Sequence, residues 1–354
     1  MGFYIGNAEL SSNKVTIIAE AGVNHLGSLE LAEKLIKAAA ESGADIIKFQ
    51  TYKANDLTIK SAPRFWSWDG ESSKDGSQHD SYSQLDSFGE EQYIELSKLC
   101  KKYEIEFMST PFSTEAAEML VRVGVKGFKL ASCDITNIPF LKEIAKHGLP
   151  MLLSTGASTL VEIHDAVNAI HKVNSNIDLC IMQCTLCYPT EYKDAHLNAL
   201  LDIKKEFPEF LLGFSDHTLG YHVPLASISL GVRVIEKHFT VDKNLPKSAD
   251  HWLSVDPDEL NKLCVYSQDI MDSLGENKKQ KLSCEDKTHA YARRSVVTNV
   301  RILSGATIKS SDVSCKRPGT GLAPVYLDKI IGSIAARDVE ADSVIVEEDI
   351  KWIT

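Results

Sequence analysis

The chain has 354 residues, a length that suggests two domains, or one large domain with an appendage. Apolar residues make up 44% and charged residues 25%, a composition typical of globular proteins. Asp and Glu exceed Lys and Arg by 49 to 38, and the formal charge of -11 argues against sequence-independent nucleic-acid binding, which needs an excess of basic residues. No apolar run is long enough to span a membrane, and the first residues (MGFYIGNAELSSNK) lack the pattern of a signal peptide. Without such a signal, the eight cysteines are expected to be reduced thiols. We therefore predict a cytoplasmic protein.

Short apolar segments alternate with amphipathic ones over most of the chain. Continuous apolar strands that alternate with helices indicate a parallel sheet covered on its faces. Eight such units in about 250 residues predict a (β/α)8 TIM barrel. A doubly wound open sheet is the alternative, although no GxGxxG follows the first strand, which disfavours its dinucleotide-binding version. The predicted strands are 15–20, 45–50, 106–110, 127–131, 151–154, 178–183, 211–215 and 234–238.

Helices are expected between these strands, for example over 90–103, 159–173 and 222–231. The helix over 29–42 is amphipathic, and its spacing places one set of residues on a single face. That face consists of Leu29, Ala32, Ile36 and Ala39.

Two segments depart from the repeating pattern. The connection 52–87 is long, polar and aromatic, and because it follows the second strand we expect a partly ordered loop on the substrate side of the barrel. After a helix that ends near residue 274, the polar, lysine-rich segment 276–290 is typical of a linker. Short strands and turns then predict a second, small domain over 291–354, which leaves 1–275 for the barrel.

Polar residues gather at the carboxyl ends of the predicted strands. In a TIM barrel these ends lie together and form the active site. Burying a charge without a partner is costly, so we interpret the set as one site rather than as separate core or capping residues. The residues are Glu20, Asn24, His25, Lys48, Gln50, Thr110, Lys129, Ser132, Asp134, Ser154, Thr155, Gln183, Tyr188, Ser215, Asp216, His217, Glu236 and His238.

His217 and His238 end the seventh and eighth strands, which are neighbours in a barrel. Either imidazole alone is more often structural than a ligand. Two imidazoles with waters and a substrate oxygen would form an open site for a divalent metal, with oxygen-rich surroundings favouring Mn or Mg and imidazole also suiting Zn, Co or Fe.

Lys48 and Lys129 lie within apolar strands and are expected to bind an anion or to form a Schiff base. Hydroxyl groups stand at four strand ends, and with the two ammonium groups they favour a ligand that carries both phosphate and carboxylate, such as phosphoenolpyruvate (PEP). Those hydroxyl groups belong to Thr110, Ser132, Ser154 and Ser215. Cys184 and Cys187 form a lone CxxC, and we interpret Cys180 and Cys184 as small core residues.

The order and content of these motifs resemble the sialic acid synthase family, the PEP-dependent synthases of nine-carbon nonulosonic acids. The resemblance covers essentially the whole chain, and SDHT, EKHF and KRPGTG are its most specific parts. The matching segments are IIAEAGVNHLG (17–27), GADIIKFQTY (43–52), STPF (109–112), FKLASCDITNIP (128–139), LSTGAST (153–159), QCTLCYPT (183–190), GFSDHTLG (213–220), VIEKHFTVDK (234–243), ARRSVV (292–297) and KRPGTGL (316–322).

The resemblance implies a TIM barrel followed by a small antifreeze-like (SAF) domain, and a homodimer in which the SAF domain of one chain covers the barrel of the other. It implies a divalent metal, Mn with Mg or Co as alternatives, on His217 and His238. It also implies three further groups of site residues. Their members are Lys48, Thr110, Lys129, Ser132, Ser154 and Ser215 for PEP; Gln50, Tyr188, Asp250 and Arg317 for the amino sugar; and Glu20, Asp134 and Glu236 for catalysis.

Three departures from the family pattern lie on the sugar side. Asp134 stands where Glu is frequent, Leu186 where some members have Asn, and Lys247-Ser248-Ala249-Asp250 where Pro-Gly-Pro-Asp is common. We predict condensation of PEP with N-acetylmannosamine to give N-acetylneuraminate and phosphate. The alternative acceptor is a 2,4-diacetamido-trideoxy hexose, as in legionaminic or pseudaminic acid synthesis, and Lys247 leaves a phosphorylated sugar open. A Schiff-base lyase and a non-catalytic carbohydrate-binding protein are the rival functions.

Overall fold

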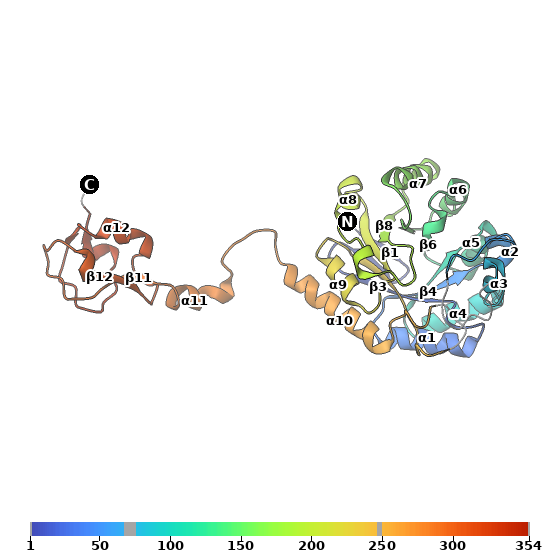
Figure 1. Cartoon of the computed structure of the whole chain (residues 1–354), viewed down its shortest axis with the longest axis horizontal. Helices are drawn as coiled ribbons and strands as arrows, with labels where there is room; N and C mark the ends of the chain where they lie inside the picture. The colour runs from blue at the N-terminus through green and yellow to red at the C-terminus, as the bar shows by residue number, and fades with distance from the viewer. Residues whose placement is uncertain (1, 67–75, 246–249, 353–354) are drawn as a thin grey trace. The chain divides into compact units, whose positions relative to one another are not determined.

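The computed structural model describes residues 2–66, 76–245 and 250–352. The chain divides into two compact units, Met1–Gly275 and Glu276–Thr354 (Figure 1). Each unit has its own hydrophobic core, and each is described by itself below. In the described part of the chain, no helix combines the length and the hydropathy that a membrane crossing needs.

Eight parallel strands of the first unit close into a barrel, in which β10 pairs back to β3. Each overlaps one of the predicted strands, so the predicted (β/α)8 barrel is confirmed and the open-sheet alternative is wrong. The closure brings the carboxyl ends of all eight strands to one end of the barrel. The strands are β3 (Thr16–Gly22), β4 (Ile46–Thr51), β5 (Glu106–Pro111), β6 (Phe128–Leu130), β7 (Met151–Ser154), β8 (Leu179–Cys184), β9 (Leu211–Asp216) and β10 (Val234–His238).

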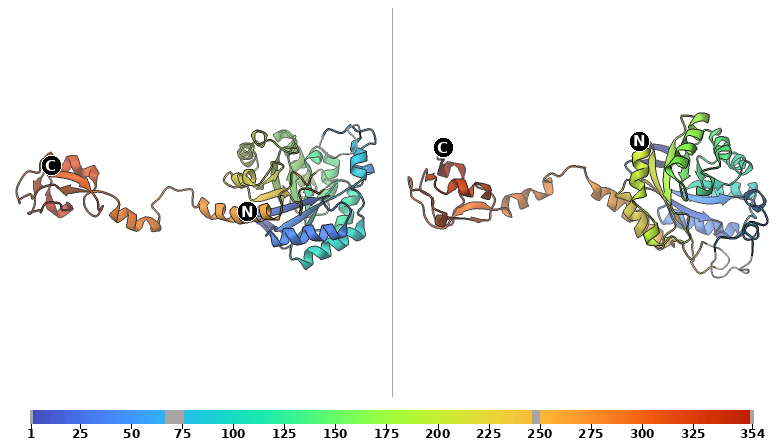
Figure 2. Two further views of the ribbon diagram at one scale, coloured as in Figure 1. Left: turned by 60° about the horizontal axis from the view of Figure 1, so that its bottom comes forward. Right: turned by 45° about the horizontal axis from the view of Figure 1, so that its top comes forward.

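Helices surround the strands (Figure 2). Capping residues set several of their starts: Thr159 accepts from the Glu162 amide, and the Glu162 carboxylate accepts from the Thr159 amide in return. The prediction for the first helix was wrong at Leu29, which is 36% exposed, while Leu35 takes its place on the buried face. The helices are α1 (Leu29–Glu41), α4 (Glu90–Lys102), α5 (Thr114–Val123), α6 (Ile138–Ala145), α7 (Leu160–Val173), α8 (Ala199–Glu206), α9 (His222–Ile228) and α10 (Pro257–Leu274), with 3₁₀ turns η1 (Ser132–Asp134) and η2 (Tyr192–Asp194).

A hairpin of β1 (Gly2–Ile5) and β2 (Ala8–Ser11) precedes the barrel and was not predicted. Its apolar side chains, which include Ile5 and Leu10, pack with the barrel-interior residues near the strand starts. The Asn7 amide donates to Glu106, the first residue of β5, at 3.0 Å. The hairpin therefore closes the amino end of the barrel and leaves the carboxyl end for the site.

The long connection after β4 contains two short helices, α2 (Ala54–Leu57) and α3 (Gln78–Ser83). The Tyr52 ring makes edge contacts with Tyr82 of α3 and with Phe112, at centroid distances of 5.4 Å and 5.9 Å. The predicted loop thus contains ordered elements before and after residues 67–75, which lie outside the described residues.

The second unit is built from short strands around a small apolar core. The segment 276–290, expected to be a linker, contains a 3₁₀ turn and most of a short helix. The elements are η3 (Ser283–Glu285), α11 (Asp286–Tyr291), β11 (Ser295–Thr298) paired with β12 (Val313–Lys316), η4 (Ser310–Asp312), η5 (Pro324–Tyr326), α12 (Leu327–Ile330), η6 (Glu347–Asp349), and β13 (Ile334–Ala335) paired with β14 (Ile350–Lys351).

Candidate active site

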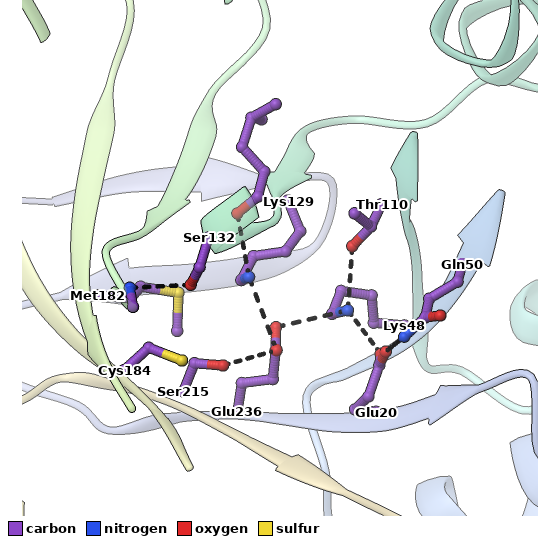
Figure 3. A network of polar contacts seen from close by, with 12 residues as sticks. Glu20, Lys48, Gln50, Thr110, Lys129, Ser132, Met182, Cys184, Ser215 and Glu236 are labelled. Carbon is purple, nitrogen blue, oxygen red and sulfur yellow. Dashed lines mark hydrogen bonds and ion pairs between the residues drawn. The ribbon is translucent and has the colours of Figure 1, made fainter. Parts of the chain in front are cut away.

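Glu236 of β10 lies between two lysines inside the barrel (Figure 3). Its Oε1 accepts a hydrogen bond from Ser215 Oγ at 3.0 Å and lies 3.7 Å from Lys129 Nζ. Its Oε2 lies 3.7 Å from Lys48 Nζ. All four side chains are almost completely buried, so each charge depends on the others for its stabilisation.

Lys48 of β4 connects this carboxylate to a second one. Its Nζ lies 2.6 Å from Glu20 Oε2 and donates to Thr110 Oγ1 at 3.1 Å. Gln50 Nε2 donates to Glu20 Oε1 at 2.9 Å. The cluster therefore contains two lysines and two carboxylates, and their formal charges cancel.

Burial and neighbouring charges separate the pKa values of the two carboxyl groups. Burial, with the nearby Glu236 carboxylate, raises the pKa of Glu20 against the effect of Lys48. For Glu236, burial acts in the same direction, but Lys129 and Lys48 outweigh it and lower the pKa. A pair of carboxyl groups with separated pKa values is suited to acid–base chemistry. Glu20 is the member that binds a proton more readily.

The two lysines also differ. Burial lowers the pKa of Lys129, although Glu236 opposes this effect. Burial acts in the same way on Lys48, but Glu20 and Glu236 outweigh it, and the pKa of Lys48 is raised. An anion that enters the cluster would favour the ammonium form of both lysines.

Two strand-end hydroxyl groups are available beside the lysines. Ser132 Oγ accepts from the Gly156 amide at 2.9 Å. Ser154 lies on the same face of β7 as Leu152, which belongs to the barrel interior, and its Oγ is buried with no hydrogen-bond partner in the described part of the chain. A buried hydroxyl without a partner is unusual and fits a ligand oxygen. Of the six residues predicted for PEP, Lys48, Thr110, Lys129 and Ser215 thus share one network, Ser132 lies beside it in Figure 3, and Ser154 faces the barrel interior.

His217 and His238 lie side by side, with ring centroids 5.3 Å apart. His217 Nδ1 lies 2.9 Å from the Thr185 carbonyl oxygen, which can only accept, so Nδ1 donates there and Nε2 is the nitrogen left for a metal. Burial lowers the pKa of His217, but Cys184 and the Thr185 carbonyl outweigh it and the pKa is raised, so a metal would have to displace a proton from Nε2. Burial lowers the pKa of His238 well below its usual value, which keeps the ring in the neutral form that binds metals.

These two rings fit a divalent metal. Zinc–imidazole bonds are about 2.0–2.1 Å long, and two rings with centroids 5.3 Å apart are close enough to share one ion of this kind. His238 Nδ1 is buried without a hydrogen bond in the described ranges, and Asp250 Oδ2 lies 3.7 Å from it. Among the described residues no group of three or more His, Cys, Asp or Glu side chains is arranged to hold a metal alone. The geometry therefore suits an open site that substrate or water oxygens complete.

The residues predicted for the sugar surround the histidines in part. The Tyr188 ring contacts the His217 ring at a centroid distance of 4.1 Å and is tilted by 38°, and Asp250, whose pKa burial raises to about 6, lies beside His238. Asp134, which was predicted for catalysis, accepts from Asn137 Nδ2 at 3.2 Å, and burial raises its pKa. Arg317 is exposed and belongs to the second unit. Lys247, which left a phosphorylated sugar open, lies outside the described residues.

Three groups near the site were missed by sequence reasoning. Cys184, interpreted as a core residue, is buried, but its Sγ lies 3.8 Å from His217 Nδ1, whereas Cys180 is in the barrel core as predicted. Burial raises the pKa of Tyr52, and Tyr82 and then Asp250 add to this effect. Burial raises the pKa of Tyr82 to about 12, and Cys133 and then Asp250 add to it, so both hydroxyl groups are within reach of the Asp250 charge. The aromatic composition of 52–87 was the only signal for the two tyrosines.

Family models match both units: the NeuB family over residues 35–279 and the SAF domain over residues 293–351. The chain belongs to the NeuB family. It is 39% identical to N,N'-diacetyllegionaminic acid synthase of Legionella pneumophila over 344 residues, 96% of each chain. It is 38% identical to the protein of the same name from Campylobacter jejuni over 335 residues, 94% of this chain and 99% of the relative. The crystal structure of an N-acetylneuraminic acid (sialic acid) synthetase from Leptospira borgpetersenii superposes with a TM-score of 0.72 at 35% identity, covering 81% of this chain and 95% of that one.

These similarities confirm the predicted family, its barrel and its SAF domain. The protein is an enzyme of the PEP-dependent nonulosonic acid synthases, whose substrates are PEP and amino sugars. Neither the Schiff-base lyase nor the carbohydrate-binding protein fits that assignment. The predicted acceptor, N-acetylmannosamine, is not confirmed, because the two curated relatives described above are synthases of a diacetamido sugar acid and favour the alternative acceptor.

Proposed function

We propose that this synthase condenses PEP with a 2,4-diacetamido-trideoxy hexose and forms a legionaminic-type sugar acid and phosphate. The observation that carries the proposal is the 39% and 38% identity to two N,N'-diacetyllegionaminic acid synthases over nearly the whole chain. We place this acceptor ahead of N-acetylmannosamine.

The sugar side of the site supports a less polar acceptor. A 6-deoxy, 4-acetamido sugar has a methyl group at C6 where N-acetylmannosamine has a hydroxymethyl group, and an acetamido group at C4 in place of a hydroxyl. Leu186, at a position where some members of the family have Asn, lies against Gly156 at the edge of the site. Tyr52 and Tyr82 add aromatic surface near Asp250. Apolar contacts of this kind favour the methyl-bearing sugar.

In the proposed reaction, C3 of PEP forms a bond with C1 of the open-chain aldehyde. Positive charge develops at C2 of the former PEP, water adds there, and the tetrahedral intermediate loses phosphate by cleavage of the C–O bond. Lys48 and Lys129 hold the anionic groups of PEP, with Ser154 Oγ as a further donor. Binding both substrates in one buried site removes much of the entropic barrier.

We assign the proton of the attacking water to Glu20. Its raised pKa makes it the better proton acceptor of the two buried carboxylates, whereas Glu236 stays ionised between the lysines. Asp134 and Asp250 are proposed to bind sugar hydroxyl or amide groups, together with Gln50 and Tyr188.

We further propose that His217 and His238 hold Mn, with Mg or Co as alternatives. When bound, the metal supplies a Lewis acid that polarises the sugar aldehyde. A homodimer in which Arg317 of one chain reaches the sugar in the barrel of the other is also part of the proposal, as is a cytoplasmic location. The eight unpaired cysteines are consistent with that compartment.

The acceptor is tested by measuring phosphate release from PEP with each sugar under identical conditions with Mn present. The expected result is a kcat/KM for 2,4-diacetamido-2,4,6-trideoxymannose at least tenfold above that for N-acetylmannosamine. A higher kcat/KM for N-acetylmannosamine would overturn the acceptor assignment and leave the family assignment intact.

A further inference from the structure

A completely buried ion pair lies directly behind the two histidines. Asp216 of β9 and Lys237 of β10 are partners in the strand register, and Lys237 Nζ donates to Asp216 Oδ2 at 2.7 Å. Their side chains are 1% and 0% exposed. Lys237 is on the same face of β10 as Ile235, which packs in the layer between strands and helices, so the pair lies outside the barrel wall and away from substrate.

The pair also fixes the turn that carries His217. Asp216 Oδ1 accepts from the Thr218 amide at 3.0 Å, and Oδ2 accepts from Thr218 Oγ1 at 2.9 Å. Lys237 Nζ donates to the Thr218 carbonyl as well. The residues on either side of His217 are therefore bonded to each other and to β10. His238 follows Lys237 directly, so one network holds the backbone of both histidines.

Stability alone does not explain this arrangement. Each charge loses its hydration on burial, and a buried ion pair is often no more stabilising than apolar residues of similar volume. A charged network does specify one geometry, because each hydrogen bond requires a particular distance and direction. A metal site needs such control, since ligand distances must lie within about 0.2 Å of their preferred values.

We propose that Lys237 and Asp216 are positioning residues that hold His217 and His238 at the separation and orientation a divalent metal requires. The role rests on the metal site of the proposed function. Neither side chain touches substrate, and both act through the histidines next to them.

The test compares the Lys237→Met/Asp216→Leu double variant with the wild-type enzyme. Replacing both charges avoids leaving one of them buried and unpaired. Thermal unfolding measures stability, and titration calorimetry measures the Kd for Mn²⁺ without substrate. We expect a Tm within about 5 °C of wild type and a Kd for Mn²⁺ raised about 10- to 100-fold, as for other outer-shell contacts. The KM for PEP should change much less than the Kd for Mn²⁺.

Lys14→Met is the matched control. Lys14 pairs with Asp45, whose Oδ2 accepts from the Ile17 amide at 2.8 Å, so it also connects neighbouring strands but at the amino end of the barrel. We expect wild-type Mn²⁺ affinity in this variant. Should the double variant unfold, Thr218→Val removes only the hydroxyl bond to Asp216, and it should weaken Mn²⁺ binding while leaving the ion pair in place.

A double variant or Thr218→Val variant that is folded and binds Mn²⁺ with wild-type affinity would overturn the positioning role. Wild-type enzyme that binds no Mn²⁺ would overturn the metal site itself, and this role with it. The two failures are distinguished because the second is seen before any substitution is made.

Discussion

Lys48→Met should weaken PEP binding strongly, since it removes the charge that joins the two buried carboxylates. Lys48 Nζ lies 2.6 Å from Glu20 Oε2 and 3.7 Å from Glu236 Oε2, and the side chain is 3% exposed. Without it, one lysine remains beside two carboxylates. The cluster then has a net negative charge unless Glu20 takes up a proton, and in either case an anionic ligand loses one of its two ammonium partners.

The size of both effects of Lys48→Met, on stability and on PEP affinity, follows from the burial of the Lys48 side chain. Removing one partner of a buried ion pair costs about 3–5 kcal/mol in stability when the other partner stays charged. Glu20 can take up a proton instead, because burial already raises its pKa, so we expect the lower end of that range. Losing a buried charge contact to a ligand costs about 2–5 kcal/mol, which corresponds to a Kd for PEP raised about 30- to 5,000-fold.

Calorimetry with PEP alone, together with thermal unfolding, checks this expectation. Lys102→Met is the control, because Lys102 pairs with Glu33 at 2.8 Å but its side chain is 60% exposed. That variant should bind PEP like the wild type. A folded Lys48→Met enzyme with unchanged PEP affinity would show that the two-lysine cluster is not the PEP site.

Three further changes test other parts of the structure. Leu186→Asn should lower the ratio of kcat/KM for the diacetamido sugar to that for N-acetylmannosamine by about tenfold, and an unchanged ratio would exclude Leu186 from the acceptor contacts. Burial lowers the pKa of His25 to about 4 from 6.5, so the folded state resists its protonation and stability falls by about 3 kcal/mol as pH drops from 6.5 to 4. In urea unfolding at several pH values, His25→Gln should lose that part of the pH dependence, and a parallel curve would contradict it. Ile5→Ala should cost about 2–5 kcal/mol of unfolding free energy without changing the KM for PEP, because Ile5 is completely buried at the amino end of the barrel, and a raised KM would show coupling between the two ends.

The barrel was predictable because its strands are continuous apolar runs that end in polar residues. The period and number of these runs determine the closed fold, and the fold places their carboxyl ends together. That reasoning located Glu20, Lys48 and His217 in one site. It also supported the contact between His217 and His238, because they follow neighbouring strands.

Contacts across the barrel interior, and contacts in the layer between strands and helices outside the barrel wall, could not be predicted in this way. Lys129 of β6 approaches Glu236 of β10, and these strands are not neighbours, so their contact depends on the radius and tilt of the closed sheet. The outward pairing of Lys237 with Asp216 requires the register of β9 and β10. Neither quantity can be obtained from hydrophobic periodicity.

The amino-terminal hairpin was missed although its signal is present. Phe3 and Ile5 alternate with polar or exposed positions, as do Ala8 and Leu10, and Gly6-Asn7 joins the two halves. Alternation around a two-residue Gly-Asn turn is a hairpin pattern. Its strands have only four residues each, so the pattern is shorter than the repeating units of the barrel and is easily overlooked.

The most direct test of the proposed condensation is phosphate release from PEP by metal-stripped enzyme in ¹⁸O-labelled water. The reaction is run with and without the diacetamido sugar, and with and without Mn²⁺. We expect release only when both are present, and phosphate free of ¹⁸O, because water adds to C2 and the C–O bond breaks. Release that needs neither sugar nor metal, or phosphate that carries ¹⁸O from water, would contradict the proposed reaction.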